Sequence, residues 1–233
     1  MDMMKYGLIG AMDEEVTFFH EHLKDTSVTR YAGITFYEGR FQGKQVVLCK
    51  CGVGKVNAAI CTQVLIDRYA VKTILFTGVA GALAPDLEVG DVVVSVECMQ
   101  HDMDVSPLGY PRGIIPYQEL SIFPADKQLV QVALEVGEER FHRRIKSGRI
   151  LSGDQFVANR DTVENLHREM NGICAEMEGA SVAQVCAMNG IPYIVIRSMS
   201  DKADGSAPDN YAAFTQKAAK NSYQMIEGLL GRL

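Results

Sequence analysis

The chain has 233 residues, of which 47% are hydrophobic and 22% charged, and its formal net charge is -6 at pH 7. A chain of this length can bury one large core, and no linker or low-complexity segment divides it, so we expect a single domain over residues 1–233. The acidic balance argues against binding of nucleic acid, which needs a clustered basic face.

Membrane and secreted proteins are also disfavoured. No apolar run approaches the length of a membrane span, and the start at Met1-Asp2 lacks the basic and apolar regions of a signal peptide. We therefore expect a cytoplasmic protein whose six cysteines are reduced. Since no Cys-x-x-Cys pair occurs, core packing explains the cysteines better than metal binding.

Two kinds of periodicity predict the secondary structure. Runs rich in β-branched residues predict strands, and apolar residues spaced by three and four predict helices. In chain order the predicted elements are a strand at Lys5–Gly10, a helix at Glu14–Lys24, a strand at Gln45–Cys49, a helix at Val56–Tyr69, strands at Thr73–Phe76 and Asp91–Val96, a helix at Asp126–Val136, a strand at Arg149–Leu151, helices at Thr162–Met170 and Glu178–Asn189, a strand at Tyr193–Met199 and a helix at Tyr211–Leu230.

The order of these elements predicts the fold class. Gly33 and Gly43 separate three short strands over residues 28–49, which indicates an antiparallel meander. Elsewhere strand and helix alternate, so we expect a single-domain, three-layer α/β fold in which helices flank a mixed, largely parallel central sheet. Asp161 with Glu164 resembles a capping box, and Pro192 separates one helix from the strand that follows.

Small or acidic residues follow most of the predicted strands. Because ligands bind at the carboxyl ends of strands in open α/β sheets, we expect Glu15, Glu178 and Asp201 in one pocket. Three acids that converge without a basic cluster favour proton-transfer chemistry on a neutral, polar substrate. Further clusters of this kind are Gly52–Lys55, Gly78–Gly81 and Ser152–Phe156.

Each of these acids also has a structural explanation. With about 100° of rotation per residue, Glu15 is the acid of its helix that points most nearly toward the core, yet an acid in a first turn can simply complement the helix dipole. Glu178 can open a helix, or accept two hydrogen bonds from a ribose diol. Asp201 can form an ion pair with Arg197, or act in catalysis.

Two further motifs lack the pattern of a phosphate, dinucleotide or metal site. Gly52-Val-Gly-Lys55 lacks the flanking residues of a phosphate loop, and Asn57 occupies the third glycine position of a dinucleotide fingerprint, so a tight turn that approaches a ligand with its backbone fits better. His101-Asp102-Met103-Asp104 lacks the spacing of a zinc helix. We expect no metal and no cofactor.

Five motifs in this order resemble the 5'-methylthioadenosine/S-adenosylhomocysteine nucleosidase family, which has a purine nucleoside phosphorylase-like fold. The match extends over essentially the whole chain. The motifs are Gly7-Leu-Ile-Gly-Ala-Met-Asp-Glu-Glu15, Gly52-Val-Gly-Lys-Val56, Ser152-Gly-Asp-Gln-Phe-Val157, Glu176-Met-Glu-Gly-Ala180 and Arg197-Ser-Met-Ser-Asp-Lys-Ala-Asp204.

The resemblance implies hydrolysis of the N-glycosidic bond of adenine thionucleosides, with methylthioadenosine, S-adenosylhomocysteine and 5'-deoxyadenosine as substrates. It implies that Asp201 is the general acid at purine N7 and that Glu15 activates water, which are the two tasks that glycosidic cleavage requires. We predict that Asp201 is protonated in the working complex. The remaining positions implied are Phe156 and Val157 for adenine, Met177 and Glu178 for the ribose, Glu176 in the same motif, and Arg197 and Ser200 as supports of the acids and the water.

The resemblance also implies a homodimer in which the partner subunit closes the pocket for the 5' substituent. Leu108 and Tyr211 stand where many members carry phenylalanine, and Val79 replaces a common serine, so a hydroxyl contact to the sugar is missing at that position. The implied 5' positions are Met12, Val53 and Tyr211 from one chain and Val105, Leu108 and Tyr110 from the other.

Three alternatives stay open. A nucleoside phosphorylase on the same fold needs arginines near the anomeric carbon, where this chain has Asp13, Glu14 and Glu15. A related nucleosidase activity acts on 6-amino-6-deoxyfutalosine in menaquinone synthesis. A nucleoside-binding sensor does not need a water-activating acid. Release of adenine from methylthioadenosine in phosphate-free buffer distinguishes hydrolysis from phosphorolysis and from binding alone.

Overall fold

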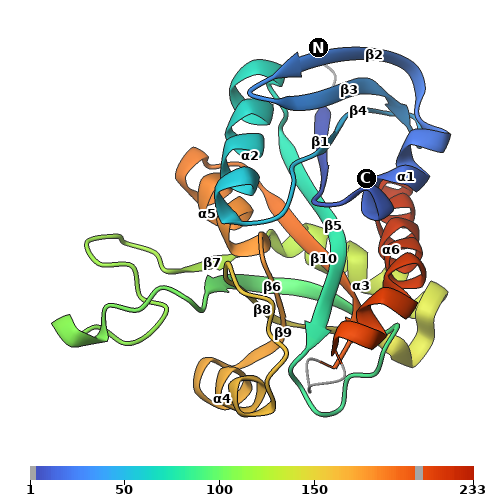
Figure 1. Cartoon of the computed structure of the whole chain (residues 1–233). Helices are drawn as coiled ribbons and strands as arrows, with labels where there is room; N and C mark the ends of the chain where they lie inside the picture. Colours follow the sequence, from blue (N-terminus) through green and yellow to red (C-terminus); the bar gives the residue numbers. More distant parts are fainter. Residues whose placement is uncertain (1–3, 203–206) are drawn as a thin grey trace.

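A mixed sheet forms the centre of the molecule, and the computed structural model describes residues 4–202 and 207–233, except for the side chains of residues 207–213 (Figure 1). The strands are β1 (Lys5–Gly10), β2 (Lys24–Tyr31), β3 (Ile34–Phe41), β4 (Lys44–Lys50), β5 (Thr73–Ala82), β6 (Val92–Gln100), β7 (Ile122–Pro124), β8 (Ile145–Ser152), β9 (Gly172–Glu176) and β10 (Tyr193–Asp201). The helices are α1 (Asp13–His22), α2 (Lys55–Tyr69), α3 (Lys127–Phe141), α4 (Arg160–Met170), α5 (Gly179–Asn189) and α6 (Ala207–Arg232), with 3-10 turns η1 (Ser106–Leu108) and η2 (His142–Arg144).

The sheet is open at one end and closed at the other. The antiparallel strands β2, β3 and β4 form the open edge, and β1 lies parallel between β4 and β5. Beyond β5 the order continues through β10, β6, β8 and β9. Because Gly81 and Ala82 of β5 pair back with β9, these five strands close into a ring. The carboxyl ends of β5, β8, β9 and β10 therefore face a common space.

Helices cover both faces of the sheet, with α1, α3 and α6 on one side and α2 and α5 on the other in Figure 1. Successive strand residues point to opposite faces, so Leu8 and Ile9 of β1 enter different apolar cores. Leu8 packs in the core under α1, α3 and α6, which also holds Phe19, whereas Ile9 shares a core with Leu65 of α2 and Val182 of α5. The expected three-layer α/β architecture is confirmed.

Most of the predicted elements are present, but some of their limits differ. Residues 78–81, expected to follow a strand, lie inside β5, because they pair with β10 and β9 in the closed part of the sheet. The helix predicted to reach Lys24 ends at His22, and Lys24 instead begins β2 by pairing with Arg40. The short strands β7 and β9 had no predicted limits, although Glu178 was expected to follow a strand, and β9 is that strand.

The capping box expected at Asp161 and Glu164 is wrong. Helix α4 begins at Arg160, two residues earlier than predicted, and its cap is Asn159, whose side-chain oxygen accepts a hydrogen bond from the Thr162 N–H at 3.1 Å. Asp161 lies within the first turn, and Glu164 pairs with Arg160 along the helix surface. Asparagine supplies the acceptor that the helix start needs, so Asp161 has no capping role.

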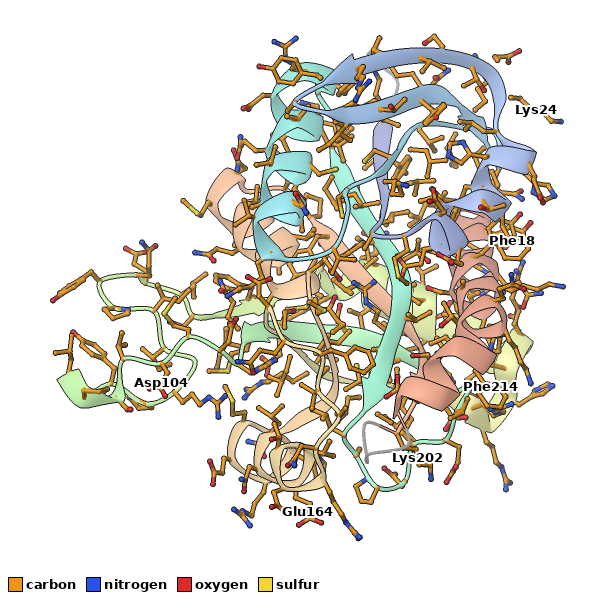
Figure 2. The ribbon with its side chains drawn as sticks, in the orientation of Figure 1. Phe18, Lys24, Asp104, Glu164, Lys202 and Phe214 are labelled. Carbon is orange, nitrogen blue, oxygen red and sulfur yellow. The ribbon has the colours of Figure 1, made fainter. Side chains whose placement is uncertain are left out.

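Residues 101–121 leave the sheet between β6 and β7 as an arm, at the left of Figure 1. The arm is tied at its base, where the Gly113 N–H donates to the Met103 carbonyl at 2.7 Å and Arg112 Nε donates to the His101 carbonyl at 2.7 Å. Its outer part is exposed, and Figure 2 shows Asp104 well away from the body. Among the described residues, no helix is long and apolar enough to cross a bilayer.

Candidate active site

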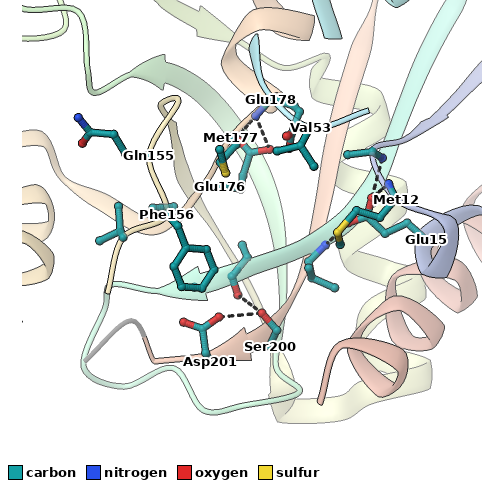
Figure 3. Close-up of a pocket in the computed structure, with 16 residues that line it drawn as sticks. Met12, Glu15, Val53, Gln155, Phe156, Glu176, Met177, Glu178, Ser200 and Asp201 are labelled. Atoms are coloured by element: carbon teal, nitrogen blue, oxygen red, sulfur yellow. Dashed lines mark hydrogen bonds between the residues drawn. The ribbon is translucent and has the colours of Figure 1, made fainter. Parts of the chain in front are cut away.

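A pocket lies at the carboxyl ends of β1, β5, β9 and β10, where the sheet closes. Its lining includes Glu15, Glu178 and Asp201, the three acids expected together from their places after strands. In Figure 3, Asp201 and Phe156 occupy one end, Glu15 and Met12 the other, and Glu178 lies near Val53. The pocket therefore has a carboxyl group at each end.

Glu15 lies in the first turn of α1, and its carboxylate accepts hydrogen bonds from three backbone N–H groups outside that helix. One carboxylate oxygen accepts from the N–H groups of Ala11 and Met12 at 2.6 and 3.0 Å, and the other accepts from the Val79 N–H at 3.0 Å. Burial raises the pKa of Glu15, while the charge of Arg197 and these N–H donors act in the opposite direction. The result is a fixed carboxyl group with a raised pKa, which suits a base that takes a proton from water.

Arg197 lies beneath the pocket and is almost wholly buried. Its guanidinium pairs with the Glu176 carboxylate, which also accepts from the Ser152 hydroxyl and the Gly179 N–H. Burial acts to lower the pKa of Arg197, but the surrounding carboxylates, with Glu176 first, leave it above its ordinary value. The Arg197 ion pair considered as an alternative role for Asp201 is thus formed by Glu176, whose carboxyl supports the floor of the pocket.

Glu178 precedes α5 and points at the pocket. Although it is the N-cap residue of that helix, its side chain makes no capping hydrogen bond; one oxygen accepts from the Gly54 N–H at 2.8 Å instead. Burial, and then the negative charge of Glu176, raise the pKa of Glu178 to about 8. The geometry therefore favours the ligand-binding interpretation of this acid over the helix-opening one.

Asp201 ends β10 and is 2% exposed. The Ser200 hydroxyl donates to one of its carboxyl oxygens at 2.8 Å, so the orientation of the acid is set by its own neighbour in the strand. The ring of Phe156, which is 52% exposed, lies over this end of the pocket in Figure 3. An aromatic ring beside a carboxyl group offers both stacking and a hydrogen bond to a planar heterocycle.

The remaining predicted positions divide into two groups. Val53, Val79, Val157 and Met177 line the same pocket as the acids. Val79 packs with Met12, Ala218 and Ala219, so the wall beside Glu15 is apolar. Gln155 also lines the pocket but was not selected as a site residue, although its place in the Ser152–Phe156 cluster was a signal.

The second group lies elsewhere in this chain. Val105, Leu108 and Tyr110 are on the arm, outside the pocket lining, and Leu108 is 72% exposed. Tyr211 belongs to α6, but its side chain lies outside the described residues. A single chain therefore leaves its pocket without the arm residues expected to close it.

Comparison with known proteins identifies the family. A family model described as the phosphorylase superfamily matches residues 5–231. A 5'-methylthioadenosine/S-adenosylhomocysteine nucleosidase from Tolumonas auensis is 40% identical over 231 residues, covering 99% of this chain and 100% of the relative. This chain belongs to the methylthioadenosine/S-adenosylhomocysteine nucleosidase family. The resemblance carried by its five motifs is confirmed.

Solved structures of this family are similar along their whole length. The nucleosidase from Neisseria meningitidis, in complex with methylthio-immucillin-A, has a TM-score of 0.94 and 33% identity and covers 98% of this chain and 99% of its own. The futalosine hydrolase of Helicobacter pylori strain 26695 has a TM-score of 0.94 and 36% identity and covers 99% of each chain. The phosphorylase/nucleosidase-like fold is thus confirmed by two solved structures, one of a nucleosidase and one of a futalosine hydrolase.

Proposed function

We propose that this enzyme hydrolyses the N-glycosidic bond of adenine thionucleosides, namely methylthioadenosine, S-adenosylhomocysteine and 5'-deoxyadenosine. The observation that carries the proposal is that two buried carboxyl groups, those of Glu15 and Asp201, line one pocket. An aromatic ring, Phe156, and a third acid, Glu178, line the same pocket. Two carboxyl groups with different environments can divide the tasks of protonating a leaving group and activating water. The relatives' names supply the substrate class.

The reaction then proceeds at the two ends of the pocket. Adenine stacks on Phe156, with the Val157 backbone at its edge, and protonated Asp201 gives its proton to N7 as the bond between the anomeric carbon and N9 breaks. Water attacks the anomeric carbon, which has gained positive charge, and its proton passes to Glu15. The products are adenine and the 5-substituted ribose, and Arg197 keeps its charge throughout beneath the two steps.

The ribose and its 5' substituent occupy the rest of the pocket in this proposal. Glu178, with Met177 beside it, accepts hydrogen bonds from the ribose hydroxyls while the Gly54 N–H holds its other side. Met12 and Val53 provide apolar surface for the 5' group. Because Val79 offers no hydroxyl, recognition of the sugar falls mainly on Glu178.

The proposal includes a homodimer in which each arm closes the partner's pocket. Large apolar side chains are exposed on the arm, on α2 and on α5, and these three segments lie on the same side of the ribbon in Figure 1. Large apolar side chains exposed on one side of a protein are typical of a protein–protein contact. The most exposed of these side chains are Val56, Leu108, Tyr117, Leu120 and Met188. Sedimentation of the wild type and of Leu108→Asp tests the dimer. We expect the variant to have a larger dimer dissociation constant, so that it is monomeric at protein concentrations where the wild type is still dimeric.

The proposed cellular setting is salvage of the methionine carbon skeleton in the cytoplasm by one nucleosidase domain that spans residues 1–233. All six cysteines are buried and free, which supports a reducing compartment.

The deciding experiment is release of adenine from methylthioadenosine in phosphate-free buffer. We expect turnover without phosphate, and loss of at least about a thousandfold in kcat for Glu15→Gln and for Asp201→Asn, as for removal of an acid or base together with its electrostatic support. Dependence of the rate on phosphate, or near-full activity of Asp201→Asn, would refute the assignment. Binding of the nucleoside without adenine release would identify a sensor.

A second activity is favoured by one comparison. The likeness to the futalosine hydrolase extends over 99% of both chains, and Val53 at the 5' end of the pocket is 48% exposed, which leaves room for a larger 5' substituent. Hydrolysis of 6-amino-6-deoxyfutalosine uses the same two acids. Comparison of kcat/KM for this nucleoside and for methylthioadenosine tests it, and values that differ by less than about tenfold would support both activities.

A further inference from the structure

Three charged residues form a closed set of contacts at the rim of the pocket. Lys55 Nζ donates to one carboxylate oxygen of Asp102 at 2.7 Å, and the backbone N–H of Asp154 donates to the other at 2.9 Å. The circuit closes where the Lys55 N–H donates to an Asp154 carboxylate oxygen at 2.8 Å. These contacts, called the brace below, join segments that are 47 and 52 residues apart in the sequence.

Each segment of the brace leads directly to the pocket or to its closure. Lys55 follows Gly54, whose N–H holds Glu178. Asp154 lies two residues before Phe156, the aromatic wall of the pocket. Asp102 lies where the arm leaves β6. A displacement of the brace would therefore move the support of the ribose acid and the aromatic wall together.

The brace is also anchored to the body of the protein. The Ser181 hydroxyl of α5 donates to the Lys55 carbonyl at 2.7 Å, and Lys55 Nζ donates a second hydrogen bond to Gln100 at 2.9 Å. Gly54 has a φ of +100°, and a Cβ there would lie 3.1 Å from the Asp154 carboxylate. Only glycine combines this backbone conformation with so close an approach, which explains the glycine-lysine turn without a bound phosphate.

The electrostatics keep the central acid charged. Burial acts to raise the pKa of Asp102, but the hydrogen bonds from Lys55 and from the Asp154 N–H hold it below its ordinary value. The side chains of Lys55 and Asp102 are only 19% and 14% exposed, so solvent screens their attraction less than that of a surface pair. The His101–Asp104 motif thus supplies an internal ion pair in place of the metal ligands it superficially suggests.

We propose that Lys55, Asp102 and Asp154 are positioning residues of the nucleosidase reaction, which keep the Gly54 N–H on Glu178 and the Phe156 turn in one fixed relation. The proposal rests on the proposed function of the pocket and adds three residues that lie outside the pocket lining. Their effect is on the mutual placement of the ribose and adenine subsites, since a displacement of about 1 Å can cost on the order of a hundredfold in rate.

Asp102→Asn tests the brace with little change in shape. An asparagine amide cannot accept on both sides, so either Lys55 or the Asp154 N–H loses its acceptor. Asp86→Asn is the matched control, because Asp86 also pairs with a lysine, Lys146, but is 73% exposed and is absent from the pocket lining. Hydrogen exchange of the free proteins should become faster over residues 52–57 and 153–157 in Asp102→Asn and stay unchanged there in Asp86→Asn.

Kinetics supply the second readout. For Asp102→Asn we expect kcat/KM for methylthioadenosine to fall by roughly tenfold to a hundredfold. We also expect the kcat/KM for methylthioadenosine, divided by the kcat/KM for its 3'-deoxy analogue, to be smaller than in the wild type, because Glu178 is no longer held against the ribose. A merely structural role would lower the melting temperature without changing this ratio. Lys55→Met removes the same pair from its other side, and the double variant should be no worse than either single one.

The outcomes separate the brace from the function it serves. Wild-type adenine release decides the proposed function, whereas hydrogen exchange decides the brace without any turnover. Unchanged exchange in Asp102→Asn, or kcat/KM and substrate ratio within twofold of the wild type, overturns the positioning role even if the enzyme is a nucleosidase. Should Asp102→Asn fail to fold, the same measurements on Lys55→Met give the answer.

Discussion

Gly78 lies in β5 where two buried side chains, Glu15, the proposed catalytic base, and Arg197, approach the strand backbone. A Cβ at this position would lie 2.5 Å from a Glu15 carboxylate oxygen and 2.9 Å from Arg197 Nη1. Gly78→Ala therefore has to open one contact by about 0.9 Å to reach an ordinary distance of 3.4 Å. No left-handed backbone is involved, so the effect comes from this crowding alone.

Glu15 has little freedom to accommodate the methyl group, because both of its oxygens accept backbone N–H groups. A shift of this size moves the base away from the attacking water and costs on the order of a hundredfold in kcat. Crowding should also lower the free energy of unfolding by about 1–3 kcal/mol, which corresponds to a fall in melting temperature of roughly 2–12 °C for a chain of this length.

The assay measures kcat, KM and the melting temperature of Gly78→Ala beside Gly231→Ala. Gly231 lies in α6, and a Cβ there meets no atom within 4 Å, so this control should keep full activity and gain slightly in stability. A folded Gly78→Ala protein with kcat within about threefold of the wild type would show that Glu15 is not confined as described, and the reasoning from close contact would fail.

Three further predictions concern the charged groups and one helix start. The pKa of Glu178 is raised to about 8, so the protonated carboxyl favours the folded state. Its contribution to the free energy of unfolding is complete below about pH 4.5 and is lost as the pH rises through 8. Glu178→Gln should remove that part of the pH dependence of the melting temperature. Arg197→Met leaves the buried Glu176 carboxylate without its partner and should cost about 3–5 kcal/mol in chemical denaturation, with Arg197→Met/Glu176→Leu less damaging than the single change. Asn159→Ala should cost about 1 kcal/mol through loss of the α4 cap, whereas a larger loss for Asp161→Ala would restore the capping role that the structure denies it.

Part of the fold can be predicted from local sequence, because the periodicity of apolar residues follows the buried face of each helix or strand. Alternating and helical periodicities mark β1, α2 and the meander, and the two turns of the meander contain Gly33 and Gly43, both at positive φ. The orientation of Glu15 toward the core followed from helix rotation alone and agrees with its burial. These features depend only on whether each residue lies on the buried or the exposed face of its own helix or strand.

Other features depend on which distant segments meet. The pairing of β5 first with β10 and then with β9 extends the strand through residues 78–81, where the Val79 N–H donates to Glu15, and no periodicity encodes these pairings. The sequence did not determine which acid pairs with Arg197, since several were available. Glu176 is the partner because the ring of strands brings it next to Arg197. The brace joins residues about fifty positions apart.

The division has a physical cause. Side-chain periodicity records whether a residue is buried, and the five motifs record chemical identity, so the sequence by itself determined the α/β layers, the acids and the family. The partner of a buried charge depends on where separate strands end in space, because an ion pair or hydrogen bond acts over only a few ångströms. The tertiary structure alone therefore decided which acid neutralises Arg197, which N–H groups hold Glu15, and how Lys55 links the glycine turn to the segment that carries Phe156.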